Sequence, residues 1–268
     1  MNRNNLFWAA LVLQCFLFFS CKSSSEEDSS QRIGEHISDE QAREIILNSI
    51  KTHGGLDRWN SIERFEYDKS MTLYLEDGEI ESSVEQNHLY QYGADEVFRV
   101  RWMSGEDEHV LYGRRGEYSK TINQQPDQSA SPELSKNSLF SSMYVIGIPY
   151  KLLDAGPDIT YEGKEEIWTG ETCDVIKVMY DPEAHPNLTT ADTWWYYFDV
   201  KDARVRAGKV KHLDHISGIR NISYVTANGF LLNHERESYR LGDNDSVLYL
   251  RARYLYDGYG IKTVDLNR

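Results

Sequence analysis

Apolar and polar residues alternate along most of the chain from Ile62 onward, which is the pattern of half-buried β-strands. Phe98, Val100 and Trp102 give a clear example, because an arginine separates each from the next. Asn228-Gly229, between two alternating segments, is typical of a type I′ hairpin. A first group of strands is predicted up to about residue 121. A second group is predicted over residues 159–162, 173–180, 193–200, 204–213, 219–226, 230–239 and 247–256.

A helical period precedes the strands. Ser38 and Gln41 have the spacing of a capping box, and Gly54-Gly55 ends the helix after His53. One stripe of this helix is small or apolar and is expected to pack on the sheet. Its members are Ala42, Ile45, Ile46, Ser49 and Ile50.

A second helix is predicted between the two groups of strands. After a polar stretch, Ser131 is an expected N-cap with Pro132 at the first helical position. The helix should run to about Tyr144, and one more apolar turn follows over residues 150–153. Because about eleven strands occur without βαβ alternation, the expected class is α+β, mostly antiparallel, with the helices on one side of a curved sheet.

Residues 1–20 have the form of a signal peptide. Arg3 provides a positive charge, and the apolar run 6–19 is shorter than the roughly 20 residues that span a bilayer. Cys21 follows a small residue. This segment resembles the lipobox of bacterial lipoproteins, in which the cysteine is lipidated after cleavage, although Phe18-Phe19 departs from its usual residues. An ordinary cleaved signal peptide is the alternative.

The remaining chain divides into a tether and a domain. Residues 21–36 are polar and are expected to form a flexible, lipid-anchored tether, and residues 37–268 a single β-rich domain. We therefore expect a cell-envelope protein, with the outer membrane favoured, whose Cys21 carries the acyl chains. Its formal charge of −14 disfavours nucleic acid and anionic membrane surfaces as partners. Cys173 would be left without a disulfide partner and is expected to be a small buried residue.

No residue pattern identifies a reaction. Neither Gly-x-Ser-x-Gly nor a glycine-rich phosphate loop occurs. His212-Leu213-Asp214-His215 is the most metal-like cluster, but a strand would place His215 opposite His212 and Asp214. Asp243-Asn244-Asp245 favours an acidic turn over a calcium loop, since no distal glutamate completes it. We expect no metal, no cofactor and no enzymatic activity.

Several segments together carry a family resemblance: residues 53–62, 147–153, 169–178 and 192–199. Their order resembles uncharacterised bacterial envelope lipoproteins and, more distantly, the outer-membrane lipoprotein-sorting (LolA/LppX-like) carrier superfamily. The resemblance covers most of the chain after His36. It implies an incomplete, half-open β-barrel wrapped around the N-terminal helix and the mid-chain helical insertion, whose concave face binds acyl chains in the best-known members. Those carriers are soluble, so the expected anchor is a departure from the family pattern.

Aromatic residues provide the candidates for a ligand site. In an extended strand Trp194, Tyr196, Phe198 and Val200 share one face, which we expect to point inward. An incomplete barrel lined by large aromatics can fill itself or leave a cavity, so plain core packing is the alternative for each residue. The ligand-lining candidates are Trp102, Trp194, Tyr196, Phe198 and Tyr254.

The sequence therefore favours a membrane-anchored, non-catalytic envelope lipoprotein that binds a lipid or other hydrophobic ligand in a concave β-sheet cavity. The alternatives are a structural or interaction lipoprotein with a filled core and an envelope hydrolase with an unrecognised site. An apolar void of roughly 300 Å³ or more would favour binding, and close packing would favour a structural role. A hydrolase requires titratable groups that converge in a cleft.

Overall fold

Thirteen strands form one antiparallel sheet in the order β6-β5-β4-β3-β2-β1-β13-β12-β11-β10-β9-β8-β7. The computed structural model describes residues 33–168, 170–180 and 192–264. The sheet and its helices belong to one compact unit, His36–Arg268, and residues 1–35 form a separate unit. The strands are β1 Ile62–Tyr74, β2 Ile80–Gln91, β3 Val97–Ser104, β4 Asp107–Arg114, β5 Glu117–Ile122, β6 Gln125–Pro126, β7 Pro157–Glu166, β8 Thr172–Tyr180, β9 Thr193–Asp199, β10 Val205–Lys211, β11 Ile216–Ala227, β12 Phe230–Leu241 and β13 Val247–Thr263.

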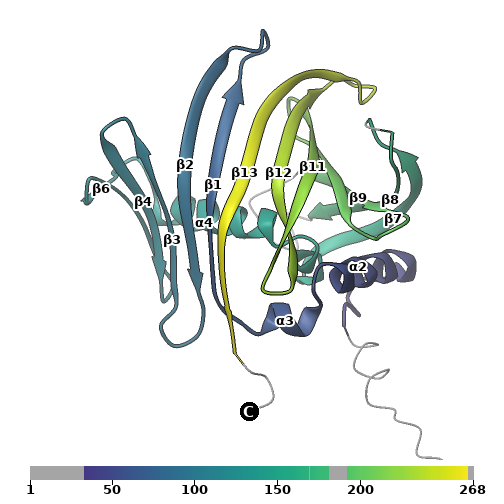
Figure 1. Ribbon diagram of the computed structural model, residues 1–268, viewed down its shortest axis with the longest axis horizontal. Coiled ribbons are helices and arrows are strands. Elements are labelled where there is room, and N and C mark those ends of the chain that lie inside the picture. The colour runs from purple at the N-terminus through teal and green to yellow at the C-terminus, as the bar shows by residue number, and fades with distance from the viewer. Residues whose placement is uncertain (1–32, 169, 181–191, 265–268) are drawn as a thin grey trace, which may run out of the picture. The chain divides into compact units, whose positions relative to one another are not determined.

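The strand order explains the shape of the sheet. Neighbours in sequence pair, except β6 and β7, and in addition the last strand, β13, pairs with the first, β1. As a result β6 and β7 are the two edges, and the sheet is strongly curved but open (Figure 1). The expected antiparallel class is confirmed, whereas the half-open barrel of about eleven strands is corrected to an open sheet of thirteen that does not close.

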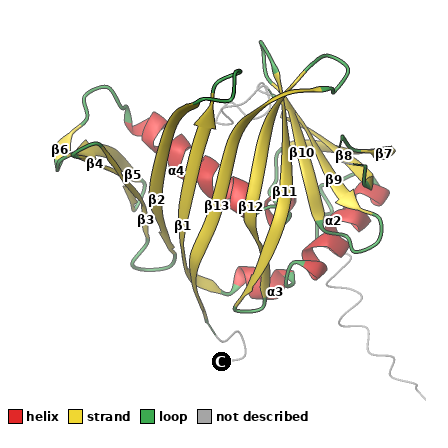
Figure 2. Cartoon of the chain, turned by 45° about the horizontal axis from the view of Figure 1, so that its top comes forward, coloured by secondary structure: helices red, strands yellow, loops and turns green. Residues whose placement is uncertain are grey.

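The mid-chain helix connects the two edges. Helix α4 spans Pro132–Ile146 and the 3₁₀ turn η1 spans Tyr150–Leu153. Ser131 is the N-cap, since its hydroxyl accepts a hydrogen bond from the Leu134 amide at 3.1 Å. Because β6 and β7 lie at opposite edges, the segment between them crosses the face of the sheet that we call the inner face, and α4 packs there on β3–β5 (Figure 2). Both predictions, the cap and the helix, are confirmed.

Helix α2, Glu40–Thr52, begins one residue later than the sequence predicted. Its N-cap is Asp39, whose carboxylate accepts a hydrogen bond from the Ala42 amide at 3.0 Å. The same carboxylate also accepts the Tyr161 amide of β7 at 2.8 Å. The prediction of Ser38 as the cap was therefore wrong, because Asp39 satisfies both the helix and a sheet edge.

A short helix, α3 at Leu56–Asn60, was not predicted. Five residues are too few to show a helical period. Trp59 fixes this helix to the rest of the fold, because its ring stacks on Tyr150 of η1 with centroids 4.4 Å apart and planes at 4°. The predicted Asn228-Gly229 hairpin is confirmed, with φ angles of 45° and 78°, and its Gly229 carbonyl accepts a hydrogen bond from Arg58 of α3 at 2.7 Å.

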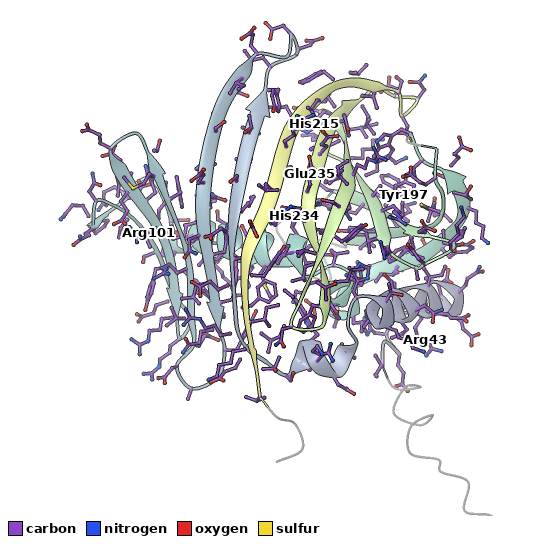
Figure 3. All side chains as sticks on the ribbon, viewed as in Figure 1. Arg43, Arg101, Tyr197, His215, His234 and Glu235 are labelled. Carbon is purple, nitrogen blue, oxygen red and sulfur yellow. The ribbon has the colours of Figure 1, made fainter. Side chains whose placement is uncertain are left out.

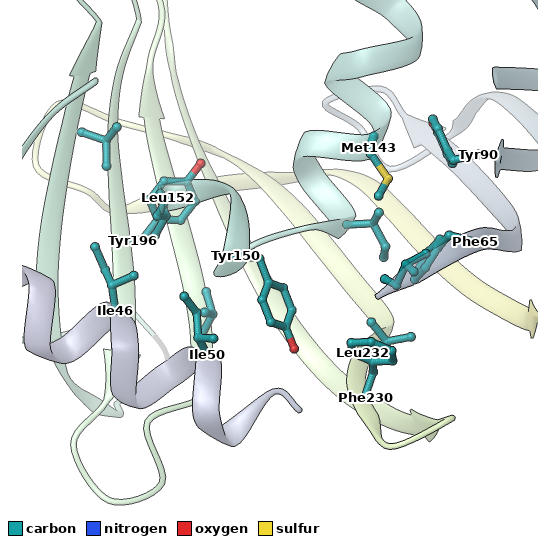
Figure 4. Close-up of a cluster of buried hydrophobic side chains, with 14 of the residues drawn as sticks. Ile46, Ile50, Phe65, Tyr90, Met143, Tyr150, Leu152, Tyr196, Phe230 and Leu232 are labelled. Atoms are coloured by element: carbon teal, nitrogen blue, oxygen red, sulfur yellow. The ribbon is translucent and has the colours of Figure 1, made fainter. Parts of the chain in front are cut away.

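The core lies between the inner face of the sheet and the helices. Figure 4 shows side chains from α2, α4 and η1 and from strands β1, β2, β9 and β12 meeting in this layer. The apolar stripe of α2 supplies Ile46 and Ile50, and α4 supplies Leu139 and Met143. Burial of these apolar side chains is the main force that holds the open sheet in its curve.

A smaller apolar cluster covers the other face of β8–β10. Tyr197 is 2% exposed there and meets Trp168 edge to face at 5.9 Å. Between the predicted inward positions of β9, Tyr197 and Asp199 are thus also buried and Trp195 is half-buried. Val200 follows the end of β9 and is 39% exposed, so the prediction that it points inward was wrong. No helix among the described residues is long and apolar enough to cross a membrane.

Candidate functional site

Two connected hollows lie between α4 and the inner face of the sheet. We call the first the aromatic chamber, which has a volume of about 40 Å³ and includes Trp194 and Tyr196. We call the second the inner chamber, which has a volume of about 210 Å³. Val145, Ile219 and Arg236 line both, so the two chambers adjoin.

The aromatic chamber is bounded mainly by apolar groups from α4 and from β9–β12. Trp194 and Tyr196 stack in parallel on β9, with centroids 5.9 Å apart. The turn after α4 closes the opposite side with Ile146 and Ile148. Its polar members include His53, Asn221, Asn233 and Arg236. Burial lowers the pKa of His53, whose Nδ1 contacts the Ser49 carbonyl at 2.8 Å.

The inner chamber is lined by tyrosines, hydroxyls and two cations. Tyr254 and Tyr256 of β13 face α4 across the chamber, and burial raises the pKa of Tyr254. Its hydroxyl therefore stays protonated at neutral pH and can donate a hydrogen bond. The full lining consists of Tyr67, Lys69, Ser141, Ser142, Val145, Ile219, Arg236, Tyr254 and Tyr256.

The two cations of the inner chamber interact with neutral groups. Arg236 donates from Nε to the Asn221 amide oxygen at 2.9 Å and from Nη1 to the Tyr256 hydroxyl at 3.2 Å. Lys69 lies over the ring of Tyr254, 5.4 Å from its centroid. Among the described residues neither cation forms an ion pair with a carboxylate. The chamber consequently has a positive potential.

A buried histidine lies next to the inner chamber. His88 stacks on Tyr67 at 4.5 Å and is fully buried on β2. Burial lowers its pKa to about 3, and Lys69 lowers it further in the same direction. His88 is therefore neutral near pH 7 and contributes no charge to the chamber.

A third, wider hollow lies across β13, β1, β2 and β3. This outer hollow has a volume of about 810 Å³ and carries carboxylates, among them Asp68 and Asp257. Arg101, labelled in Figure 3, lines it and pairs with Glu108 at 2.5 Å. Its carboxylates distinguish it from the inner chamber, and Lys69 lines both.

The five candidate residues lie in different places. Trp194 and Tyr196 line the aromatic chamber, Tyr254 lines the inner chamber, and Trp102 lines the outer hollow. Phe198 is 1% exposed in the core and lines none of the three hollows in the described part of the chain. Cys21, the expected lipid attachment, lies outside the described residues.

Sequence reasoning missed Lys69 and Arg236. Lys69 stands at the inward position between Tyr67 and Met71 of a strand that otherwise alternates regularly. Arg236 likewise shares its strand face with Leu232. A charged residue at an apolar position of an alternating strand was the available signal, but the convergence of β1 and β12 on one chamber depends on the three-dimensional fold.

The polar clusters that the sequence singled out form turns. His212 and His215 flank the β10–β11 turn with rings 4.4 Å apart, and each contacts a carboxylate, Asp192 and Asp214 respectively. No three His, Cys, Asp or Glu side chains of the described chain gather where they could hold a metal ion. Asp245, in the β12–β13 turn, pairs with Lys209 at 2.6 Å.

Comparison with solved structures finds similar folds at low sequence identity. A DUF1329 family protein from Desulfovibrio piger has a TM-score of 0.50 at 8% identity, covering 82% of this chain and 92% of that chain. A LolA superfamily protein from Nitrosomonas europaea has a TM-score of 0.47 at 8% identity, covering 84% and 94%. An outer membrane lipoprotein-sorting protein domain from Vibrio parahaemolyticus has a TM-score of 0.47 at 8% identity, covering 83% and 96%.

The first of these similarities shows a shared fold. The distant similarity to the lipoprotein-sorting superfamily, expected from the order of elements, is confirmed as a similarity. Comparison with curated proteins gives no match. Among family models, one described as a family of unknown function, DUF6503, matches residues 115–254. Since that span is more than half of the chain, the chain belongs to the DUF6503 family of unknown function.

Proposed function

We propose that this chain is a non-catalytic lipoprotein of the cell envelope, anchored through Cys21, that holds a lipid or other apolar molecule between α4 and the inner face of its sheet. The observation that carries the proposal is the pair of adjoining chambers, which core packing leaves open beside α4. Apolar and aromatic walls with a few polar groups are typical of small-molecule sites.

The position of α4 supports this proposal. The helix contacts the strands near the β6 edge, and its last turn reaches the aromatic chamber through Val145 and Ile146. The filled part of the core thus lies beside the strands near the β6 edge, and the open space lies beside the last turn of α4. A ligand could enter beside α4 without disruption of the sheet, because α4 is attached by side chains and not by strand pairing.

Native mass spectrometry tests the proposal. The chain from residue 22 onward, purified without detergent from a bacterial host, contains the whole compact unit that begins at His36. We expect a co-purified apolar ligand that adds mass to the native ion and disappears on denaturation. A Val145→Trp variant should lose this ligand, because the larger ring fills the junction of the two chambers.

A matched control uses the same helix. Leu134 lies on the exposed side of α4 and is 58% exposed, so Leu134→Trp should keep the ligand. Circular dichroism establishes that both variants are folded. Recovery of the bare polypeptide alone from the unsubstituted chain would contradict the proposal.

One observation favours a second candidate, a structural lipoprotein with a filled core. Each of the two chambers is smaller than the roughly 300 Å³ at which ligand pockets usually begin. Under this reading the chambers hold only water around Arg236 and Lys69. The mass measurement separates the two candidates, since a structural protein would carry no apolar ligand and Val145→Trp would change nothing.

A further inference from the structure

The inner chamber encloses positive charge without a matching carboxylate. Arg236 donates two hydrogen bonds to neutral groups, the Asn221 amide oxygen and the Tyr256 hydroxyl. Its Nη2 has no hydrogen-bond partner among the described residues, and Lys69 contacts only the face of an aromatic ring. Arg236 and Lys69 are both half-buried, and a charge partly withdrawn from water is stabilised by a nearby opposite charge. The chamber is therefore suited to an anion.

Several other cations of the sheet pair with carboxylates. Arg206 pairs with Asp199 at 2.8 Å, and Arg253 pairs with Glu237 at 2.9 Å. Lys209 pairs with Asp245 at 2.6 Å. In a chain of net charge −14 carboxylates are abundant, yet none lines the inner chamber; Lys69 also lines the outer hollow, which carries Asp68 and Asp257.

We propose that the ligand is a free fatty acid whose carboxylate lies between Arg236 and Lys69 in the inner chamber and whose chain runs toward the aromatic chamber. This inference rests on the proposed function. The planar guanidinium fork matches a carboxylate, and the protonated hydroxyl of Tyr254 can donate to the same oxygens.

The shape of the chambers favours one chain with a small head group. Val145 and Ile219 form an apolar passage from Arg236 to the stacked rings of Trp194 and Tyr196. At about 40 Å³ the aromatic chamber has room for the end of one chain and not for two. A head group larger than a carboxylate would compete with the chain for the roughly 210 Å³ of the inner chamber.

Laurate and lauryl alcohol, which share one alkyl chain and differ in charge, test this inference. Tryptophan fluorescence of the delipidated chain from residue 22 onward reports binding, because Trp194 lines the site. We expect laurate to bind at least about tenfold more tightly than the alcohol. Arg236→Gln and Lys69→Gln should each remove most of this preference.

Two controls accompany these variants. Lys262→Gln removes an exposed cation of β13 that pairs with Glu63. It should leave the preference for laurate intact. Val145→Trp should weaken both ligands equally, since it blocks the passage and not the charge site. Circular dichroism and thermal unfolding establish that each variant is folded.

The outcomes separate the two proposals. Equal affinity for laurate and lauryl alcohol, unaffected by the charge variants, would overturn the fatty-acid assignment and leave apolar binding in place. Tighter binding of lysophosphatidylglycerol than of laurate would also overturn it, because the site would then recognise a phosphate head group. Absence of binding by every amphiphile would overturn this inference together with the proposed function.

Discussion

His88 is a titratable side chain that the fold keeps neutral. It is fully buried on β2, stacked on Tyr67, and its ring nitrogens contact the Tyr90 hydroxyl and the Gln86 amide oxygen at 3.3 Å each. These partners are neutral, and Lys69 lies nearby. A proton on His88 would therefore place a positive charge in an apolar layer beside another cation.

Stability should fall in acid because of His88. Its pKa is about 3 in the folded chain and 6.5 in the unfolded chain. As pH falls through this window the unfolded chain binds a proton that the folded chain does not, so the free energy of unfolding decreases. A His88→Phe variant keeps a stacked ring but has no imidazole to protonate. Between pH 7 and pH 4 its free energy of unfolding should therefore fall by roughly 2–3 kcal/mol less than that of the unsubstituted chain.

Urea unfolding at the two pH values measures this effect. An identical decrease in His88→Phe and in the unsubstituted chain would show that carboxylates alone set the acid sensitivity.

Cys173 should be unreactive in the folded protein. It is fully buried in the small apolar cluster of β8–β10, and burial raises the pKa of its thiol to about 12. We expect iodoacetamide to label it roughly a thousandfold more slowly in the native chain from residue 22 onward than in urea. In a Cys173→Ala background, Ser82→Cys on the exposed part of β2 should label rapidly without urea. Equal rates at the two positions would contradict the burial of Cys173.

At the scale of elements, Asp39 joins α2 to the edge strand β7. Its carboxylate accepts one amide from the helix and one from the strand, and the hydrogen bond from the Tyr161 amide is the main cause that lowers its pKa. One side chain thus satisfies two backbone donors that would otherwise lack partners.

Asp39→Ala should destabilise the domain by about 2 kcal/mol, because it removes a helix cap and a hydrogen bond to the sheet edge. Ser38→Ala is the matched control, since Ser38 is exposed and precedes the cap, and should change stability by less than about 0.5 kcal/mol. Chemical denaturation of the two variants measures the difference. A larger loss of stability in Ser38→Ala than in Asp39→Ala would instead support Ser38 as the N-cap, as the sequence suggested.

Short sequence patterns predicted the elements that depend only on residues close together in the chain. The period of two located the strands, Ser131-Pro132 located the start of α4, and Asn228-Gly229 located a hairpin. The cap of α2 was misplaced because Ser38 and Asp39 are both good caps, and a contact with Tyr161, 122 residues away, decides between them. Helix α3 was missed because its stability comes from the stacking of Trp59 on a distant ring.

In the candidate site, too, the features that depend on local sequence were predictable and those that depend on long-range contacts were not. The aromatic face of β9 was predictable from alternation, and Trp194 and Tyr196 do line a chamber. The charge site was not predictable, because Lys69 of β1 and Arg236 of β12 meet only through the pairing of both strands with β13. Phe198 shows the limit of the pattern: it shares the face of Trp194, but it lies where the helices fill the core.

At the scale of the whole sheet, the open curve leaves two edge strands. At one edge β6 is only two residues long and includes Pro126, which lacks a backbone donor. At the other edge β7 is ten residues long, and Asp39 occupies one of its amides. The end of β7 beyond this contact carries Lys164, Glu165 and Glu166, all exposed. Charged side chains on an edge strand oppose its pairing with a second sheet.

Replacement of these three charges by valine should therefore promote self-association through β7. The substituted strand would present β-branched apolar side chains beside unpaired backbone groups, which is the combination that templates edge-to-edge pairing. Size-exclusion chromatography with light scattering should show a larger mass for the triple variant than for the unsubstituted chain at the same concentration. Valines at Glu76, Asp77 and Glu79, in the β1–β2 turn, also remove three charges but add no strand edge, and should leave the mass unchanged. If both triple variants associate equally, lost charge and not the β7 edge controls the assembly, and the long edge strand must be protected by its twist and by α2 instead.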